Sequence, residues 1–251
     1  MKVLGIESSS LVASVAVVSG DVLTAEYTVN FKKTHSQTLL PMIDEVSRML
    51  ELDPGTLDAI AVSGGPGSFT GLRIGSATAK GLGLALKKPL IHVPTLDAMA
   101  YNLYGASALI CPIMDARRDQ VYTGLYRFEQ EFAVVREQCA ADIRELIGEL
   151  NERGERVIFL GDGVPVYEGV IRENATVPFS FAPAQANRQR AASVAALGAV
   201  YFAEGRTESA MEHKPDYLKK AQAERELEEA TRRGKTDELA AGHSVGTGEE
   251  R

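Results

Sequence analysis

Apolar residues along the first hundred positions fall into short runs that alternate with helical patterns. Three runs, at 3–6, 14–18 and 22–29, have the length of β-strands, and alternate side chains of the third would face opposite sides of a sheet. Three such strands in succession predict an antiparallel meander. A helix is expected next, with Thr34 as its N-cap and an apolar stripe over 35–50.

The remaining pattern completes this plan and then repeats it. The first half continues with a strand, a helix, a strand and a helix at 59–63, 71–86, 90–93 and 96–104. The second half has the same order, with strands at 108–114, 121–128 and 132–135, a helix capped by Asp142 and running to 152, a strand at 157–160, a helix at 166–172, an extended piece at 177–181 and a helix at 191–203. The repeat predicts two α/β lobes, 1–104 and 105–218, followed by a charged tail, 219–251, that is helical or disordered.

Similar residues stand at equivalent positions of the two predicted lobes. The first strand of each lobe ends in a carboxylate, and the fourth runs into a glycine-rich turn. Ligands of α/β sheets gather at the carboxyl ends of strands. The arrangement resembles the two-lobed actin, Hsp70 and sugar-kinase (ASKHA) superfamily, a duplicated ribonuclease H-like α/β fold with mixed sheets flanked by helices. The cleft between the lobes of that superfamily holds ATP and a divalent ion.

The candidates for such a cleft site are Glu7, Ser8, Asp115, Gly161 and Gly163. We favour a simpler interpretation, in which the serines only make the turn and the carboxylates are solvated or pair with Arg117 or Arg118. The turn at 64–71 is not a Walker A loop, because no Gly-Lys-Ser/Thr ends it and Pro66 removes a backbone donor.

Composition limits the classes of protein that the chain can belong to. The 251 residues carry a formal charge of −7, which argues against unaided binding to a phosphate backbone. Cys111 and Cys139 form no metal-binding spacing, and a disulfide framework is not expected. The chain lacks an apolar run of membrane-spanning length and a signal-peptide pattern at its start, so a reduced cytoplasmic protein is expected.

The most distinctive stretch is Ser-Gly-Gly-Pro-Gly-Ser-Phe-Thr-Gly-Leu-Arg-Ile-Gly at 63–75. Together with Leu-Gly-Ile-Glu-Ser-Ser-Ser at 4–10, His-Ser-Gln-Thr-Leu-Leu-Pro-Met-Ile at 35–43 and Pro-Asp-Tyr-Leu-Lys at 215–219, it resembles the TsaB (YeaZ) family over roughly residues 1–220. These bacterial proteins are needed to make threonylcarbamoyladenosine at position 37 of tRNAs that read codons beginning with A. The chain departs from the family pattern in having Glu-Ser-Ser for Asp-Thr-Ser and Tyr-Leu-Lys for Tyr-Leu-Arg.

The resemblance implies a non-catalytic subunit that pairs with the transferase TsaD, is joined by the ATPase TsaE, and meets tRNA through the complex. It also implies a possible homodimer when TsaD is absent, with ATP and metal on the partner subunits and no cofactor of its own. TsaD proteins hold a metal with two histidines four residues apart, whereas the position four residues after His35 is Leu39. His92, His213 and His243 belong to no ligand spacing, so no metal site is predicted.

In this family the first two helices meet TsaD, and their sequences fit an interface. Small residues recur every fourth position from Gly71, which would let another helix approach closely, although the same row could pack on its own sheet. The helix at 35–50 is apolar enough for two buried faces. The predicted interface residues are His35, Leu39, Leu40, Ile43, Gly71, Gly75, Ala79 and Gly83. The main alternative is an ATP-binding enzyme, an ATPase or kinase, that uses its own cleft; a metalloprotease-like hydrolase and a self-assembling scaffold are further ones.

Overall fold

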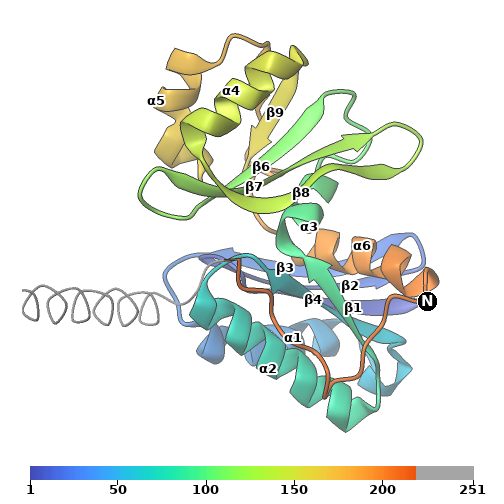
Figure 1. The fold of residues 1–251 in the computed structure, drawn as a ribbon. Coiled ribbons are helices and arrows are strands. Elements are labelled where there is room, and N and C mark those ends of the chain that lie inside the picture. Colours follow the sequence, from blue (N-terminus) through green and yellow to red (C-terminus); the bar gives the residue numbers. More distant parts are fainter. Residues whose placement is uncertain (219–251) are drawn as a thin grey trace, which may run out of the picture. The chain divides into compact units, whose positions relative to one another are not determined.

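The computed structural model describes residues 1–218, so the tail predicted at 219–251 lies outside the described residues. The first sheet has the strand order β3-β2-β1-β4-β5, and the second has the order β10-β9-β6-β7-β8 (Figure 1). In each sheet the first strand pairs antiparallel with the second strand and parallel with the fourth. The predicted duplication of a mixed α/β sheet is therefore confirmed.

The first sheet follows the predicted order closely. Its strands are β1 (Lys2–Glu7), β2 (Val12–Ser19), β3 (Val22–Asn30), β4 (Ala59–Gly65) and β5 (Leu90–Pro94). The helices of this half are α1 (His35–Met49), α2 (Phe69–Leu86) and α3 (Thr95–Tyr101), with a short 3-10 turn, η1 (Pro54–Thr56), before β4. Thr34 is the N-cap residue of α1, as predicted, but its side chain accepts no hydrogen bond from the helix.

The second sheet contains β6 (Leu109–Asp115), β7 (Gln120–Phe128), β8 (Phe132–Asp142), β9 (Val157–Leu160) and β10 (Phe179–Phe181), and its helices are α4 (Ile143–Arg153), α5 (Val164–Asn174) and α6 (Ala191–Ala203). Strand β8 is longer than the predicted 132–135, because its pairing with β7 continues as far as Asp142 opposite Gln120. Asp142 caps α4 as predicted, since its Oδ1 accepts the N–H groups of Arg144 at 2.8 Å and Glu145 at 3.4 Å.

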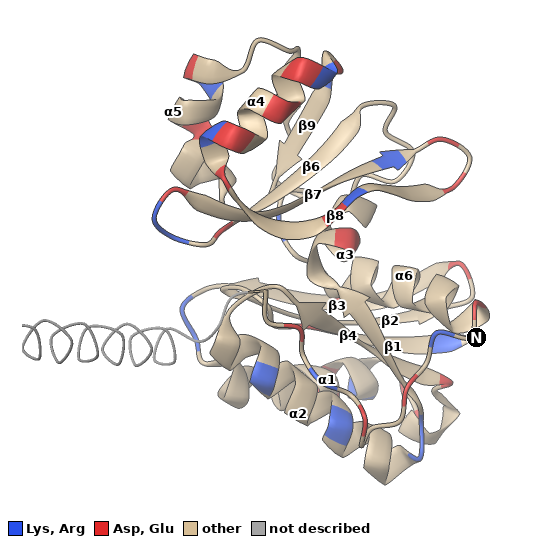
Figure 2. Ribbon diagram, in the orientation of Figure 1, with Lys and Arg blue, Asp and Glu red and all other residues tan. Residues whose placement is uncertain are grey.

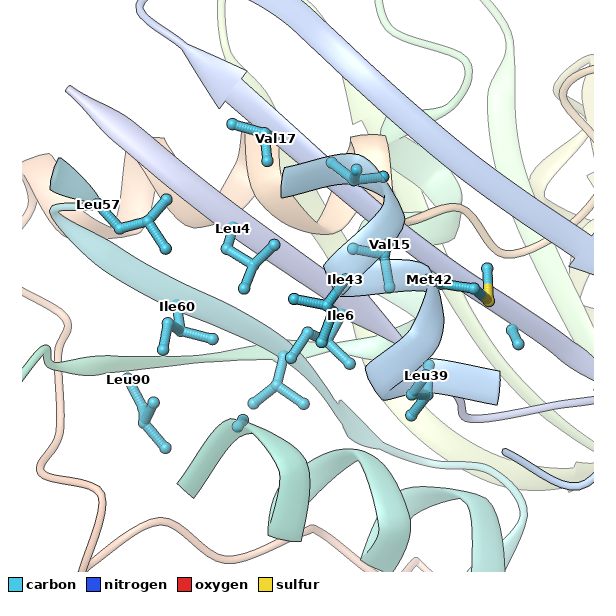
Figure 3. Close-up of a cluster of buried hydrophobic side chains, with 14 of the residues drawn as sticks. Leu4, Ile6, Val15, Val17, Leu39, Met42, Ile43, Leu57, Ile60 and Leu90 are labelled. Atoms are coloured by element: carbon cyan, nitrogen blue, oxygen red, sulfur yellow. The ribbon is translucent and has the colours of Figure 1, made fainter. Parts of the chain in front are cut away.

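Helices α1 and α2 cover one face of the first sheet. Apolar side chains of α1 at helical spacing meet Leu4, Ile6, Val15 and Ile60 of the strands (Figure 3). These α1 side chains are Leu39, Met42, Ile43 and Val46. The second sheet is covered in the same way by α4 and α5, where Ile143, Leu146, Ile147 and Leu150 repeat the spacing. Each sheet thus has a core formed with the apolar faces of its own helices, whose buried residues recur at helical spacing.

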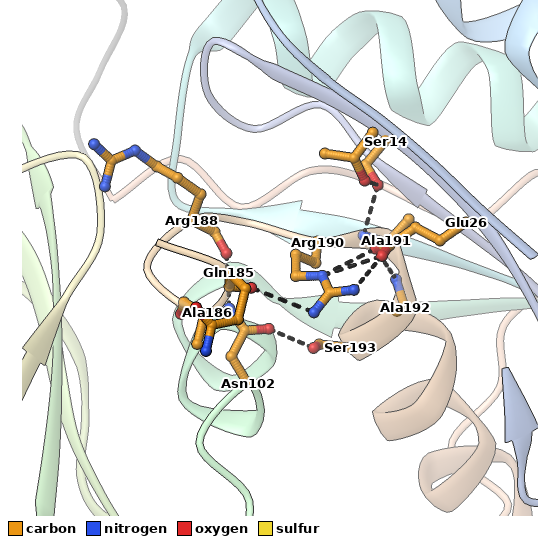
Figure 4. A network of polar contacts seen from close by, with 11 residues as sticks. Ser14, Glu26, Asn102, Gln185, Ala186, Arg188, Arg190, Ala191, Ala192 and Ser193 are labelled. Atoms are coloured by element: carbon orange, nitrogen blue, oxygen red, sulfur yellow. Dashed lines mark hydrogen bonds and ion pairs between the residues drawn. The ribbon is translucent and has the colours of Figure 1, made fainter. Parts of the chain in front are cut away.

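Helix α6 does not stay with the second lobe, to which the pattern assigned it. Its buried residues pack against Val3, Ala61 and Ile91 on the other face of the first sheet. A polar network fixes its start: Glu26 accepts from Nε of Arg190 and from the N–H of Ala192 at 3.1 Å, and Ser14 Oγ accepts the N–H of Ala191 at 3.0 Å (Figure 4). The predicted division at 104/105 separates the two sheets, but the chain returns to the first sheet after the second.

Helix α3 lies against both sheets. Leu96 and Met99 of α3 are buried in one cluster with Ile110 of β6 and Tyr126 of β7, while Ala98 belongs to the cluster under α6. Asp97 accepts hydrogen bonds from the hydroxyls of Tyr126 at 2.9 Å and Tyr201 at 3.0 Å. None of the helices within residues 1–218 is long and apolar enough to cross a membrane.

Candidate functional site

The turn after β1 carries the first predicted site residues, and its polar groups are engaged within the chain. Oε1 of Glu7 accepts the N–H and the hydroxyl of Ser9, both at 2.6 Å, and the hydroxyl of Ser8 donates to the carbonyl of Gly71 at 2.9 Å. Glu7 and Ser8 are both fully buried. Burial raises the pKa of the Glu7 carboxyl to about 6, against the opposing effect of the hydrogen bonds from Ser9.

The glycine-rich loop between β4 and α2 is packed directly onto this turn. The N–H of Ser68 donates to the carbonyl of Ser9 at 2.6 Å, and Ser68 caps α2. A Cβ on Gly67 would lie 2.3 Å from the same Ser9 carbonyl, and one on Gly71 would lie 2.1 Å from the carbonyl of Ser8. Glycine is required at these two positions because two backbone segments touch there. The close contact between these two backbone segments is a sufficient reason for the glycines, and no bound phosphate group is needed to explain them.

The equivalent region of the second lobe is more open to solvent. Asp115, at the end of β6, is exposed, and its Oδ1 accepts the hydroxyl of Tyr167 at 3.0 Å and the N–H of Arg117 at 2.9 Å. Gly161 and Gly163 both lie against the carbonyl of Ile113, so they are brought to the end of β6 as the repeat predicted. The sequence analysis named Arg117 as a possible partner of Asp115, and Arg117 contacts this carboxylate through its backbone N–H.

Asp162 is a residue of this region that the sequence analysis did not single out. Burial raises the pKa of its carboxyl, and the charge of Asp115 acts in the same direction. Asp162 in turn adds to the raised pKa of Glu7, so acidic groups of the two lobes influence one another. Its position between two predicted glycines was the available signal. Carboxylates so placed have the chemistry to hold a hydrated divalent ion or to take up a proton.

The predicted interface residues are mostly buried. Seven of them lie in the interior of the chain, namely His35, Leu39, Ile43, Gly71, Gly75, Ala79 and Gly83, and Leu40 alone of the eight is exposed, at 55%. A Cβ on Gly75 would lie 2.2 Å from the hydroxyl of Ser8, and one on Gly83 would lie 2.9 Å from Leu90. The row of small residues from Gly71 thus packs on the home sheet, and its geometry does not come from a partner helix.

A different set of residues forms the outward side of the same two helices. We define the α1–α2 face as the exposed residues Leu40, Pro41, Ala77, Gly81, Leu84 and Ala85, which share the outward side with exposed polar residues such as Gln37, Asp44 and Arg73. Leu84 is 59% exposed, and a Cβ on Gly81 would meet no other atom of the described chain within 4 Å. Helix α2 carries two basic residues, Arg73 and Lys80, and no acidic one (Figure 2). The residues of the α1–α2 face are apolar and mostly small, and α2 contributes no negative charge beside them.

His35 supports the turn after β1 and does not face outward. Its Nε2 lies 2.7 Å from the carbonyl of Ser10, and its ring touches the position of a Cβ on Gly71. Two of the other histidines, His92 and His213, come together although the sequence places them far apart. Sequence spacing could not indicate this pair, since only the tertiary structure brings the two segments side by side.

Taken together, two sheets of one topology, each with a carboxylate and a glycine-rich turn at its strand ends, define a two-lobed protein of the actin-like class. Residues 26–227 match the family model described as "TsaD: tRNA N6-adenosine threonylcarbamoyltransferase". The Bacillus subtilis "tRNA threonylcarbamoyladenosine biosynthesis protein TsaB" is 33% identical over 89% of this chain and 96% of its own length. The Escherichia coli protein of the same name is 27% identical over 87% of this chain and 95% of its own length.

A solved structure agrees with these relatives. "YeaZ from Pseudomonas aeruginosa" superposes with a TM-score of 0.72 at 25% identity, and the match covers 86% of this chain and 99% of that one. The chain belongs to the TsaB (YeaZ) family of tRNA threonylcarbamoyladenosine biosynthesis proteins. The family resemblance seen in the motifs is thereby confirmed.

Proposed function

We propose that this protein is a non-catalytic partner subunit of a TsaD-type transferase in the cytoplasmic synthesis of threonylcarbamoyladenosine at position 37 of tRNAs reading codons that begin with A. It pairs with the catalytic subunit, assembles with a TsaE-type ATPase, and meets tRNA through the complex. In the absence of TsaD it forms a homodimer. ATP and metal for the reaction belong to the partner subunits.

One observation carries this proposal: the polar groups at the strand ends of the first lobe form hydrogen bonds with other groups of the same chain. Glu7 and Ser8 are buried and hydrogen-bonded to Ser9 and Gly71, and the glycine-rich loop rests on the same turn. Groups that position a phosphate or a metal need free donors or lone pairs facing the ligand. Here those groups instead hold β1, β4 and α2 together, as a docking scaffold requires.

The α1–α2 face is the docking surface that we propose for the catalytic subunit. Small exposed residues allow a partner helix to approach closely, and the exposed side chains of Leu40 on α1 and Leu84 on α2 supply apolar contact. The same face would serve a homodimer, since an apolar patch that lacks its partner can be covered by a second copy. This assignment replaces the buried residues predicted from the small-residue row.

Replacing glycine with arginine on this surface tests the assignment. Gly81→Arg places a long charged side chain on the α1–α2 face without disturbing the core, because the position is open. We expect affinity for the TsaD-type subunit to fall at least about tenfold, measured by pull-down and calorimetry. Gly148→Arg is the matched control, since Gly148 is an equally open helical glycine on α4. Wild-type affinity of Gly81→Arg and of Ala77→Arg would remove the α1–α2 face from the proposal.

The pathway itself has a separate test. Deletion of the gene should abolish threonylcarbamoyladenosine in total tRNA nucleosides analysed by mass spectrometry, and a plasmid copy should restore it. Restoration by Glu7→Gln is also expected, because a non-catalytic subunit does not need an ionised carboxylate at this position. Normal levels of the nucleoside in the deletion strain would contradict the pathway role.

The second candidate function is an ATP-binding enzyme, an ATPase or kinase, that uses its own strand-end residues. It is favoured by the raised pKa values of Glu7 and Asp162, because shifted carboxyls gather at functional sites. Calorimetry of the isolated protein with Mg·ATP decides between the two functions. Micromolar binding that Asp162→Asn weakens would favour the enzyme, whereas absence of heat at millimolar nucleotide would favour the docking subunit.

A further inference from the structure

The segment that follows α6 returns along the first sheet beside α2 (Figure 1). Glu208 forms an isolated antiparallel bridge with Leu90 of β5, and the N–H of Asp216 donates to the carbonyl of Gly64 at 2.6 Å. We call residues 204–218 the return segment. Lys80 of α2 holds it as well, donating to the carbonyls of Met211 and His213 at 3.4 and 3.2 Å.

Two histidines and a carboxylate converge where this segment crosses β5. One nitrogen of His92, one nitrogen of His213 and one carboxylate oxygen of Glu208 lie within 4.8 Å of one another. The imidazole rings of His92 and His213 are 5.7 Å apart between centroids. His92 comes from β5 and the other two from the return segment, so no sequence motif joins them.

The hydrogen bonds of His213 leave one of its nitrogens without a protein partner. Its Nδ1 lies 2.6 Å from Oε1 of Glu208, so Nδ1 carries the proton when Glu208 is ionised, and Nε2 presents a lone pair. The His213 side chain is completely buried, and its Nε2 accepts no hydrogen bond from the described residues. An unpartnered buried lone pair has an energetic cost that a bound cation removes.

The second imidazole is in a similar position. Nε2 of His92 is buried and makes no hydrogen bond within residues 1–218, although Oδ2 of Asp216 lies 3.2 Å from it. The side chain of His92 is 23% exposed and that of Asp216 is 61% exposed, so solvent reaches the cluster from this side. An ion can therefore enter without unfolding the segment.

We propose that His92 and His213 bind a zinc-class divalent cation, with Asp216 as the neighbouring carboxylate ligand and Glu208 orienting the His213 ring through its Nδ1. Two imidazoles and a carboxylate are a ligand set that Zn²⁺ favours, whereas Mg²⁺ and Ca²⁺ prefer oxygen alone. The site is independent of the α1–α2 face and of the proposed function.

Binding would also tighten the return segment on the sheet. Ligand atoms around a tetrahedral zinc ion lie about 3.4 Å apart, from bond lengths near 2.1 Å. The nitrogens of His92 and His213, which lie up to 4.8 Å apart, must therefore come closer, and this draws the return segment toward β5. The ion would then act as a clamp between β5 and residues distant from it in the chain.

Titration of the chelator-treated full-length protein with Zn²⁺ against a chromogenic competitor tests the site. We expect one equivalent to bind with micromolar or tighter affinity, and thermal unfolding to shift upward by about 5 °C or more when free zinc is 100-fold above its Kd. His92→Gln and His213→Gln should each weaken binding at least about 100-fold and abolish the thermal shift. His243→Gln is the matched control and should bind as the wild type does.

The outcome that overturns the site is equally definite. Absence of stoichiometric binding, or binding that neither His92→Gln nor His213→Gln weakens, would exclude it. If the buried His213 variant does not fold by circular dichroism, His92→Gln and Glu208→Gln carry the test, since both side chains are partly exposed. In that case unchanged zinc affinity of both variants would contradict the proposal.

Discussion

At the scale of single residues, Asp97 of α3 connects this helix with β7 and α6, which follow it at a distance in the sequence. It is 5% exposed and accepts hydroxyl hydrogen bonds from Tyr126 of β7 and Tyr201 of α6. Burial raises the pKa of Asp97, and the two hydroxyl donors act against this increase. The network orients α3 between the two sheets and α6, so one carboxylate supports packing in both lobes.

Removing this acceptor should cost substantial stability. Asp97→Ala leaves two buried hydroxyls without a partner, and we expect the free energy of unfolding to fall by about 2–5 kcal/mol in urea titrations. Asp97→Asn should lose less, because its amide oxygen still accepts one hydroxyl. The exposed Asp21→Ala serves as a control, with a change within about 0.5 kcal/mol. Equal stability of Asp97→Ala and wild type would show that the network contributes little.

Glu7 gives a prediction for the pH dependence of stability. Its pKa is about 6 in the folded protein and 4.5 as the ordinary value, so the folded state binds the proton more tightly. The stabilisation is fully present below pH 4.5 and is lost as pH rises through 6, an effect of about 2 kcal/mol. Glu7→Gln should therefore lack this decline when unfolding is measured between pH 4 and 7.5. Parallel stability profiles for the two proteins would refute the assigned titration.

At the scale of elements, the close fit of α6 on the first sheet depends on missing side chains. A Cβ on Gly198 would lie 2.6 Å from the Cβ of Ala61 on β4, and one on Gly5 of β1 would lie 2.4 Å from the carbonyl of Ala191. Helix and sheet therefore meet at backbone distance. Any side chain at Gly198 or Gly5 would push α6 away from β1 and β4.

Gly198→Ala tests this contact against a matched glycine. Alanine favours a helix by about 0.5–1 kcal/mol over glycine, and Gly169→Ala on α5 should gain that amount because its Cβ meets nothing within 4 Å in the described chain. Gly198→Ala should instead lose about 1–3 kcal/mol through the clash with Ala61. The difference between the two variants in urea unfolding measures the clash, and a gain in both would show that the sheet yields easily.

At the scale of the whole molecule, the first lobe is not a continuous piece of chain. Helix α6 and the return segment cover the first sheet after the chain has built the second. The described residues 1–218 accordingly form one compact unit. Fragment 1–104 would expose Val3, Ala61 and Ile91, which α6 buries in the complete chain.

The fragment should therefore fail to fold on its own. Exposed apolar sheet surface of this kind favours aggregation or a fluctuating state. We expect poor dispersion in an amide correlation spectrum of fragment 1–104 and no cooperative thermal transition, in contrast to the full chain. A well-dispersed spectrum with a melting temperature close to that of the full chain would show that α6 is dispensable for the first lobe.

Local order along the chain is the part that the sequence determined. Strand and helix periods lie in neighbouring residues, so the repeat of one α/β plan, the cap at Asp142 and the stripe of α1 were predictable. The motifs also carried the family. The tertiary structure decided the direction of each packed face, because a row of small residues is compatible with a home sheet or a partner helix. It turned Gly71 and Gly75 inward and left Gly81 exposed.

The tertiary structure also decided which distant residues meet. No spacing predicts that His92 will face His213, that Glu26 will bind Arg190 or that α6 will leave its lobe, because these contacts depend on the path of the backbone between segments. Sequence alone determined the elements, their order and the family. Burial, possible only in three dimensions, determined that Glu7 holds a turn together and that the outer residues of α1 and α2 remain available for contact.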